Sequence, residues 1–314
     1  MTRKVVFMGT PDFAVQSLDA IVRAGYEVAA VVTVPDKQSG RGLKINQSPV
    51  KEYALEHGLT VLQPEKLRDD SFLSDLQALQ ADVFVVVAFR MLPRVVWSMP
   101  RMGTFNLHAS LLPQYRGAAP INWAVMNGET KTGVTTFLLN ENIDEGAVLM
   151  QCETEISYND TAETLHDRLA LMGSGLVVQT LEALFEGTAE PQAQKEAGAL
   201  RPAPKIFKQD CAVDWCRRGT DVRNFIRGLS PYPAAYTTFV DEKGREIQTK
   251  IFESEFEKTD KATEKTIETD GKKQLKIGVN DGFIRILSLQ ISGKKRVTIE
   301  EFLRGYDVSR WKLI

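Results

Sequence analysis

The first 160 residues alternate short apolar runs with amphipathic segments, and this alternation restricts the possible folds more than any other feature of the chain. A short apolar run bounded by turn residues is typical of a buried strand, whereas apolar residues at helical spacing indicate an amphipathic helix. Strands that alternate with helices form βαβ units, in which helices cover both faces of a mostly parallel sheet. We therefore predict an α/β, Rossmann-like domain with strands at Val5–Met8, Glu27–Val34, Asp82–Phe89, Gly103–His108 and Thr132–Leu139.

The helices of this domain carry residues that favour helix starts. Thr10 is expected to cap the first helix and Ser48 the second, because both hydroxyls can accept from a free backbone N–H. Pro49 follows Ser48 at a position that suits proline. A longer helix is predicted from Asp160 to about Phe185, where leucines recur at helical spacing.

A second, smaller domain is predicted at the C-terminal end. Residues 187–204 are rich in Ala, Gly, Pro and Gln and have no periodicity, which is typical of a linker. We expect domains at 1–187 and 205–314, joined by a linker at 188–204. The later part predicts a small antiparallel, OB-like β-barrel after a short helix at Thr220–Gly228, with the charged stretch Glu253–Lys273 as a flexible excursion between strands. The barrel strands are predicted at Ala235–Val240, Ile247–Phe252, Leu275–Val279 and Phe283–Leu289.

Composition excludes several classes of protein. The longest apolar runs, such as Val83–Phe89, are far shorter than the roughly 20 residues that span a bilayer, and the apolar run near the N-terminus is too short for the core of a signal peptide. The three cysteines, an odd number in a long chain, favour reduced thiols in the cytoplasm and make a structural metal site improbable. We expect a cytoplasmic monomer without a metal or a membrane partner, since no exposed apolar stripe calls for a second subunit.

The net charge of −2 hides an asymmetry, because residues 1–204 sum to −7 and residues 205–314 to +5. A basic region indicates either a polyanionic partner or, more commonly, a solvated surface of mixed charge. The charge alone does not decide between them.

Asn106, His108 and Asp144 are candidates for chemistry. Asn106 and His108 project to one face of a predicted inner strand because side chains alternate along a strand, and Asp144 lies in the polar loop after the next strand. If that strand lies beside the first, the carboxylate of Asp144 can approach His108 and orient it. Each residue by itself is more often structural, but together they supply an amide donor, a proton carrier and a charge. This set suits acyl transfer to an external amine.

Two other readings are weak. Ser110 lacks the GxSxG turn of a hydrolase nucleophile. The turn at Gly9-Thr10-Pro11 lacks the GxGxxG pattern, so a nicotinamide or flavin cofactor is not expected.

Several motifs together resemble the folate-dependent formyltransferases, and among them the members that act on methionyl-tRNA. The resemblance is carried by 7–14 (FMGTPDFA), 35–42 (PDKQSGRG), 48–51 (SPVK), 106–113 (NLHASLLP), 115–121 (YRGAAPI), 144–146 (DEG) and 213–215 (VDW). It is clear over about residues 1–240 and weak beyond.

The resemblance implies transfer of the formyl group of 10-formyltetrahydrofolate to the α-amino group of methionine on initiator tRNA. The catalytic residues of the family fall on Asn106, His108 and Asp144. Either His108 or a water held by Asp144 accepts the amine proton, and the residues leave this choice open. Folate contacts are expected from Ser110, Leu111, Leu112, Pro113, Arg90 and Met91.

One departure concerns the folate pocket, because Arg90 stands where many relatives carry Gly and adds a charge that can pair with the glutamate end of folate. The resemblance also favours tRNA contact for part of the barrel and for the basic loop with Lys37, Arg41 and Lys44. The alternatives are another folate-dependent formyltransferase, a formyltetrahydrofolate hydrolase, and, from a different class, a non-catalytic RNA-binding module.

Overall fold

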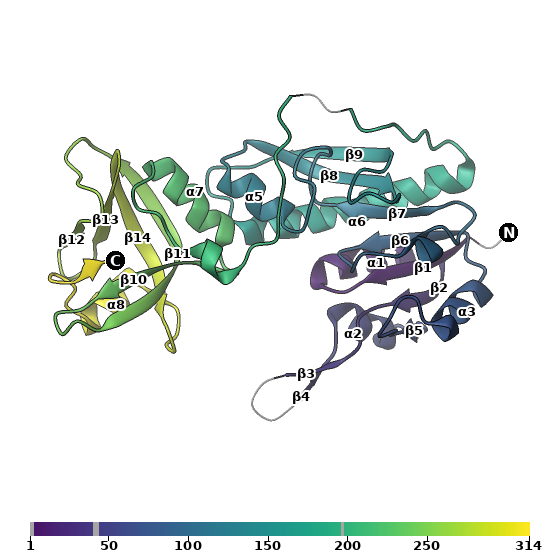
Figure 1. Ribbon diagram of the computed structural model, residues 1–314, viewed down its shortest axis with the longest axis horizontal. Helices are drawn as coiled ribbons and strands as arrows, with labels where there is room; N and C mark the ends of the chain where they lie inside the picture. Colours follow the sequence, from purple (N-terminus) through teal and green to yellow (C-terminus); the bar gives the residue numbers. More distant parts are fainter. Residues whose placement is uncertain (1–2, 40–43, 196–197) are drawn as a thin grey trace. The chain divides into compact units, whose positions relative to one another are not determined.

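The computed structural model describes residues 3–39, 44–195 and 198–314 of the chain. They divide into two compact units that are not contiguous in sequence (Figure 1). Unit 1 comprises residues 1–117, 131–155 and 166–202, and unit 2 comprises residues 118–130, 156–165 and 203–314. Of the predicted linker 188–204, this division counts residues 188–202 with unit 1 and residues 203–204 with unit 2.

Unit 1 is built on a seven-stranded sheet with the strand order β5-β2-β1-β6-β7-β8-β9. The first five strands in this order pair in parallel, whereas β8 pairs antiparallel with both β7 and β9. The strands are β1 (Lys4–Gly9), β2 (Glu27–Val32), β5 (Val61–Leu62), β6 (Val83–Val87), β7 (Thr104–His108), β8 (Lys131–Leu138) and β9 (Val148–Glu155). A separate antiparallel pair is formed by β3 (Lys37–Ser39) and β4 (Lys44–Asn46).

The helices before and between these strands are α1 (Asp12–Arg23), α2 (Pro49–Glu56), α3 (Asp70–Ala78) and α4 (Arg94–Trp97), and α6 (Ala162–Glu186) follows β9. The cap predicted for α2 is confirmed, because the Ser48 hydroxyl accepts from Lys51 N at 3.1 Å. The cap predicted for α1 is wrong: the N-cap position is occupied by Pro11, which has no side-chain hydrogen-bonding group, and Thr10 lies one residue too early.

The core of unit 1 follows from the apolar runs of its central strands. Val5, Val6, Phe7 and Met8 of β1 are fully buried, and every residue of β6 is buried. A parallel strand covered on both faces is expected to be apolar at every position, which explains why these runs do not alternate. By length and composition α6 could also cross a membrane, but half of its most apolar window is buried in the fold, as in a core helix.

Unit 2 contains an antiparallel sheet with the strand order β12-β13-β14-β11-β10-β16, and β15 pairs with β14. Together these strands form a nearly closed barrel, which confirms the predicted combination of a parallel-rich α/β domain and a C-terminal β-barrel. The strands are β10 (Ala235–Val240), β11 (Glu246–Lys258), β12 (Ile267–Thr269), β13 (Leu275–Val279), β14 (Gly282–Ile291), β15 (Val297–Thr298) and β16 (Lys312–Leu313). The helices are α5 (Pro120–Met126), the 3₁₀ turn η1 (Lys208–Cys211), α7 (Gly219–Leu229) and α8 (Ile299–Gly305).

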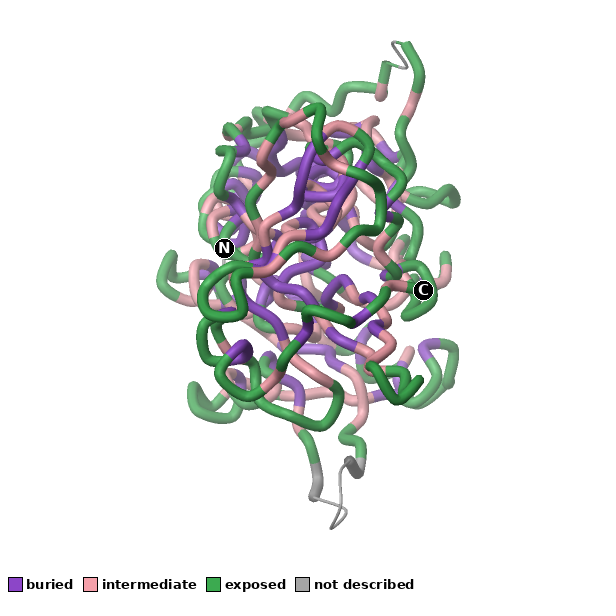
Figure 2. The backbone as a smooth tube through the Cα atoms, turned by 90° about the vertical axis from the view of Figure 1, so that its left-hand side faces the viewer, coloured by how far each residue is buried: buried purple, intermediate pink, exposed green. Residues whose placement is uncertain are grey.

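The core of unit 2 lies between the sheet and its helices. Trp215 is nearly fully buried, and its indole donates to Thr237 Oγ1 at 3.0 Å. Phe239 and Ile226 belong to the same buried cluster. The buried stretches are mainly strands and helix faces, whereas the connecting turns are exposed (Figure 2).

The predicted excursion at Glu253–Lys273 is wrong in part. Residues 253–258 continue β11, and residues 267–269 form β12. The glutamates of this stretch alternate along the strand and form ion pairs: Glu255 with Arg285 of the adjacent strand β14, Glu257 with Lys276 of β13, and Glu253 with Arg296, which precedes β15. Cross-strand pairs of opposite charge stabilise a sheet, so this charge run is the outer face of a strand.

Candidate active site

The site is built around β7, which carries Asn106 and His108 at the end of the parallel part of the sheet. His108 is 6% exposed, and Asn106 is half-buried. Leu107 points to the opposite face, where it meets α6 so closely that a Cβ on Gly173 would lie 2.6 Å from its Cδ2. The alternation therefore gives Asn106 and His108 a common face, as a strand requires.

His108 lies between a backbone carbonyl and a carboxylate. Its Nε2 is 2.8 Å from the Tyr115 carbonyl oxygen, and its Nδ1 is 3.8 Å from Asp144 Oδ2. A carbonyl only accepts, so Nε2 carries a hydrogen and donates it to Tyr115. The nitrogen that gains or loses a proton is therefore Nδ1, on the side of Asp144.

Asp144 is held in an unusual backbone conformation. Its φ of +54° lies in the left-handed region, which aspartate tolerates better than most residues. Its Oδ2 accepts from Gly117 N at 2.9 Å, and its side chain is 16% exposed. The structure thus brings Asp144 to His108, and it does so because β8 pairs with β7, the condition on which this approach was predicted.

The segment Ser110–Pro113 follows β7, and several of its polar groups are paired. The Ser110 hydroxyl donates to the Gln114 carbonyl at 2.6 Å, so it is not directed at His108 as a nucleophile would be. Thr135 of β8 donates to the Ser110 carbonyl at 2.6 Å and accepts from Leu112 N at 3.2 Å. Gln151 of β9 donates to the Leu112 carbonyl at 2.9 Å. Sequence reasoning missed Thr135 and Gln151, since no local pattern links them to this segment.

Arg90 and Met91, the other residues predicted to contact folate, follow β6. The Arg90 guanidinium donates to the carbonyl oxygens of Pro64 and Glu65, and the bond to Glu65 is 2.8 Å long. Burial lowers the pKa of Arg90. Met91 is 80% exposed. The Arg90 guanidinium is thus bound to backbone carbonyls of the same domain, and the apolar side chain of Met91 is exposed to solvent.

The residues predicted to contact tRNA lie on or near the β3–β4 pair. Lys37 opens β3 and is exposed, Lys44 opens β4, and Arg41 lies outside the described residues. At the base of the pair, Lys51 Nζ is 2.6 Å from Asp36 Oδ2. The hydrogen bonds from Lys51 and Gln63 lower the pKa of Asp36. This pair projects beyond α2 in Figure 1.

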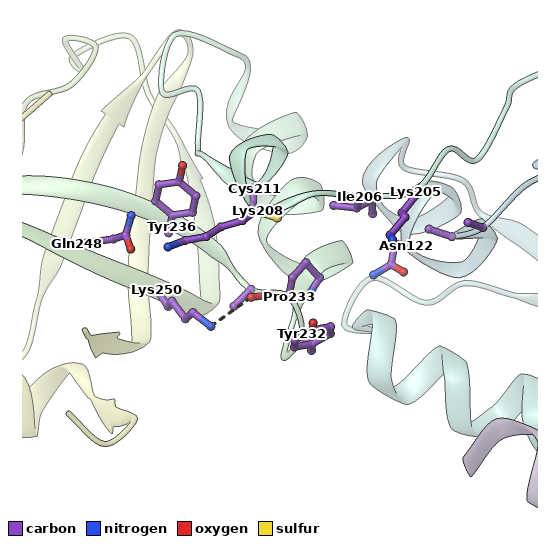
Figure 3. A pocket seen from close by; sticks show the side chains of 13 residues that line it. Asn122, Lys205, Ile206, Lys208, Cys211, Tyr232, Pro233, Tyr236, Gln248 and Lys250 are labelled. Atoms are coloured by element: carbon purple, nitrogen blue, oxygen red, sulfur yellow. Dashed lines mark hydrogen bonds between the residues drawn. The ribbon is translucent and has the colours of Figure 1, made fainter. Parts of the chain in front are cut away.

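Unit 2 contains a basic pocket that no residue-level prediction named. It has a volume of about 410 Å³, and Lys205, Lys208 and Lys250 line it together with Tyr232 and Tyr236 (Figure 3). Tyr232 is 81% exposed, and Lys250 Nζ donates to the Pro233 carbonyl at 3.3 Å. Among the described residues, none of the three lysines pairs with a carboxylate. The closely spaced Lys205 and Lys208 were the one signal in the sequence that could have pointed to this pocket.

The described residues contain no group of three or more His, Cys, Asp or Glu side chains that could hold a metal ion. The cysteines are free thiols, with Cys211 buried and Cys152 and Cys216 exposed. Burial raises the pKa of the Cys211 thiol, which disfavours its reactive thiolate form.

Comparison with known proteins matches both parts of the chain. Residues 3–181 match the formyl transferase family, and residues 205–307 match the formyl transferase C-terminal domain. The chain is 54% identical over 310 residues to methionyl-tRNA formyltransferase from Bacteroides thetaiotaomicron, an alignment that covers 98% of this chain and 96% of the relative. It is 50% identical over 306 residues to methionyl-tRNA formyltransferase from Flavobacterium johnsoniae, covering 98% of this chain and 97% of the relative.

Among solved structures, an N-formyltransferase from Helicobacter canadensis, in complex with folinic acid and dTDP-3-aminofucose, has a TM-score of 0.64. The alignment covers 95% of this chain and all of that one at 20% identity. At this identity the likeness concerns the fold alone.

Proposed function

Because this chain belongs to the formyl transferase family, we propose that it transfers the formyl group of 10-formyltetrahydrofolate to the α-amino group of methionine on initiator methionyl-tRNA. Relatives that share about half of its residues over nearly its full length are methionyl-tRNA formyltransferases. The observation that carries the chemistry is His108, whose Nε2 is bound to the Tyr115 carbonyl while its Nδ1 is 3.8 Å from Asp144.

The reaction needs an oxyanion stabiliser and a route for one proton. The neutral amine attacks the formyl carbon, the new C–N bond forms, and negative charge develops on the formyl oxygen. The Asn106 amide and protonated His108 Nδ1 are the donors proposed for that oxygen, and the Asp144 carboxylate offsets the charge of the imidazolium. When the bond between the formyl carbon and the donor nitrogen breaks, the amine has lost a proton and tetrahydrofolate has gained one.

His108 has one nitrogen for this work. Its Nε2 hydrogen is engaged by the Tyr115 carbonyl, so His108 acts through Nδ1 alone: a protonated Nδ1 donates to the oxyanion, whereas a neutral Nδ1 accepts the amine proton, and the two roles exclude each other in one step. A water bound by Asp144 is the other acceptor for the amine proton. Neither route uses Ser110, whose hydroxyl is bound to Gln114.

The two substrates are proposed to contact different residues. The formyl donor is proposed to contact Ser110–Pro113, Arg90 and Met91. Hydrogen bonds from Thr135 and Gln151 fix the backbone of Ser110–Pro113, which supports its use as a binding surface. The tRNA contacts Lys37, Arg41 and Lys44 and also the basic pocket of unit 2, whose lysines and exposed Tyr232 suit phosphates and an unstacked base. On this proposal the enzyme is a cytoplasmic monomer with domains at 1–187 and 205–314.

The acceptor is tested by incubating the purified protein with 10-formyltetrahydrofolate and, in parallel, with charged initiator tRNA, glycinamide ribonucleotide, dTDP-3-aminofucose or no acceptor. Formyl-methionyl-tRNA as the dominant product is the expected result. Formylation of either small molecule, or free formate without acceptor, would replace the proposed acceptor and leave the roles of Asn106, His108 and Asp144 in place. A folded protein that binds tRNA and forms none of these products would be a non-catalytic RNA-binding module.

A further inference from the structure

The segment 188–202 is fastened to unit 1 at specific points, although its composition is that of a linker. Gln192 and Val148 exchange two backbone hydrogen bonds of 2.8 Å. Two residues further on, Gln194 is half-buried, whereas Ala193 and Lys195 on either side of it are exposed. The side chain of Gln194 is therefore directed inward at this point.

The Gln194 amide makes four hydrogen bonds within unit 1. Its Nε2 donates to the carbonyl oxygens of Asp144 at 2.8 Å and Gly146 at 2.9 Å. Its Oε1 accepts from Arg116 through Nη2 at 2.7 Å and Nε at 3.1 Å. A neutral amide is the side chain that can donate to two carbonyls and accept from a guanidinium at the same time.

These bonds connect the two segments that set the position of the Asp144 carboxylate. One is the loop of residues 144–146, whose backbone Gln194 holds directly. The other is Arg116–Gly117, since Gly117 N donates to Asp144 Oδ2 at 2.9 Å. Arg116 also binds Glu145 Oε1 at 3.1 Å, so the guanidinium joins Gln194 to the loop a second time.

The loop itself is tightly constrained. Asp144 has a φ of +54°, and a Cβ on Gly146 would lie 1.6 Å from the Leu138 carbonyl oxygen. A left-handed residue other than glycine persists where its surroundings fix it. The bonds from Gln194 to the carbonyls of Asp144 and Gly146 hold the two ends of this turn.

We propose that Gln194 is a positioning residue, which together with Arg116 fixes the loop of residues 144–146 and thereby the Asp144 carboxylate beside His108 Nδ1. The inference rests on the proposed function, in which Asp144 serves catalysis. It assigns to residues 192–194 of the predicted linker a part in the reaction, in addition to joining the two domains. Loss of Gln194 is expected to affect the rate of formyl transfer more than the binding of either substrate.

The test compares Gln194→Ala with Gln194→Glu and with Gln192→Ala, which serves as a matched control because the bridge of Gln192 to Val148 uses the backbone only. Formylation of charged initiator tRNA is measured for kcat and for the KM of both substrates, and thermal unfolding is recorded for each protein. For Gln194→Ala we expect kcat to fall by about 10- to 100-fold, since small misplacements of a catalytic group reduce rates on this scale. Both KM values should stay within about twofold of wild type.

Gln194→Glu keeps the acceptor for Arg116 and loses both donors to the loop carbonyls, so it should also lose kcat while remaining folded. Gln192→Ala should match wild type. The inference is overturned if Gln194→Ala retains the wild-type kcat, or if its losses only follow the fraction of unfolded protein. If Gln194→Ala does not fold, Gln194→Glu decides alone, and a wild-type kcat for it overturns the inference. A wild-type protein that fails to formylate tRNA would instead refute the proposed function.

Discussion

At the scale of single residues, the site depends on what each polar group is already bound to. The Tyr115 carbonyl occupies one nitrogen of His108, Gln114 occupies the Ser110 hydroxyl, and Gly117 N occupies one side of the Asp144 carboxylate. His108 Nδ1 and the half-buried amide of Asn106 are left to contact a substrate. Substitutions of Asn106 and of Asp144, which faces His108 Nδ1, test the two groups separately.

Asn106→Ala removes a proposed oxyanion donor without removing any buried apolar group. The turnover for formyl transfer should fall by about 10²- to 10³-fold, the usual effect of losing one such donor, and the unfolding temperature should stay near that of wild type. Single-turnover formylation of charged tRNA measures the effect. Asn280→Ala, at an exposed position in unit 2, is the control. Near wild-type turnover in Asn106→Ala would refute the role given to this residue.

Asp144→Asn isolates the charge of the carboxylate. Asparagine adopts the left-handed conformation readily, and its amide oxygen can still accept from Gly117 N, so the loop should keep its shape. Without the negative charge the imidazolium of His108 is less stabilised, and we expect kcat to fall by at least about 10²-fold with little change in the unfolding temperature. A variant as active as wild type would show that the charge of Asp144 does not contribute to the rate.

At the scale of elements, the sheet and the long helix place the site, and the sequence predicted them well because their apolar patterns are strong. The continuous apolar run Val5–Met8 indicated a buried strand, and the helical spacing of leucines over residues 160–185 indicated a long helix. β9 was not predicted, since its apolar residues are confined to the short run Val148–Met150, the rest of this edge strand is mostly polar, and none of its residues is fully buried. The stretch 253–258 was misjudged because its alternating glutamates were read as a charge run and not as period-two alternation.

The packing of α6 on β7 gives a prediction at this scale, because two glycines of the helix differ in their surroundings. A Cβ on Gly175 would meet no atom within 4 Å, whereas one on Gly173 would lie 2.6 Å from Leu107 Cδ2. Gly175→Ala should therefore stabilise the protein by about 0.5–1 kcal/mol, the cost of glycine in a helix. Gly173→Ala should gain less or destabilise the fold, and it should lower kcat because Leu107 lies between Asn106 and His108.

Urea denaturation and formylation rates of the two glycine variants provide the check. Equal stabilisation by both substitutions, with unchanged kcat in Gly173→Ala, would mean that Leu107 can move without disturbing its neighbours on β7.

At the scale of the whole molecule, the sequence predicted two domains and a candidate catalytic trio, but it could not predict the groups that hold these three residues in place. Asn106 and His108 share a strand, so their common face follows from local geometry. Gln194 lies 50 residues after Asp144, in a stretch without periodicity, and only the tertiary fold brings them together. The same holds for the basic pocket, which joins Lys208 of η1 to Lys250 of β11.

That pocket carries the last prediction, which concerns how the protein recognises a polyanion. Each lysine that neutralises a phosphate releases about one counterion, so removing it should reduce the salt dependence of tRNA binding as well as its strength. In Lys208→Ala and Lys250→Ala we expect the KM for tRNA to rise several-fold, and the slope of log KM against log salt to decrease by about one for each lysine. The KM for 10-formyltetrahydrofolate should not change, because these residues lie in unit 2 and the proposed folate contacts in unit 1.

Lys131→Ala is a suitable control, since this lysine is already paired with Glu153 at 2.6 Å. Steady-state formylation at several salt concentrations measures both quantities. If the slope of log KM against log salt stays at its wild-type value in both pocket variants, these two lysines do not contact phosphates. The basic charge of the pocket is then a solvated surface, and tRNA is bound by other residues.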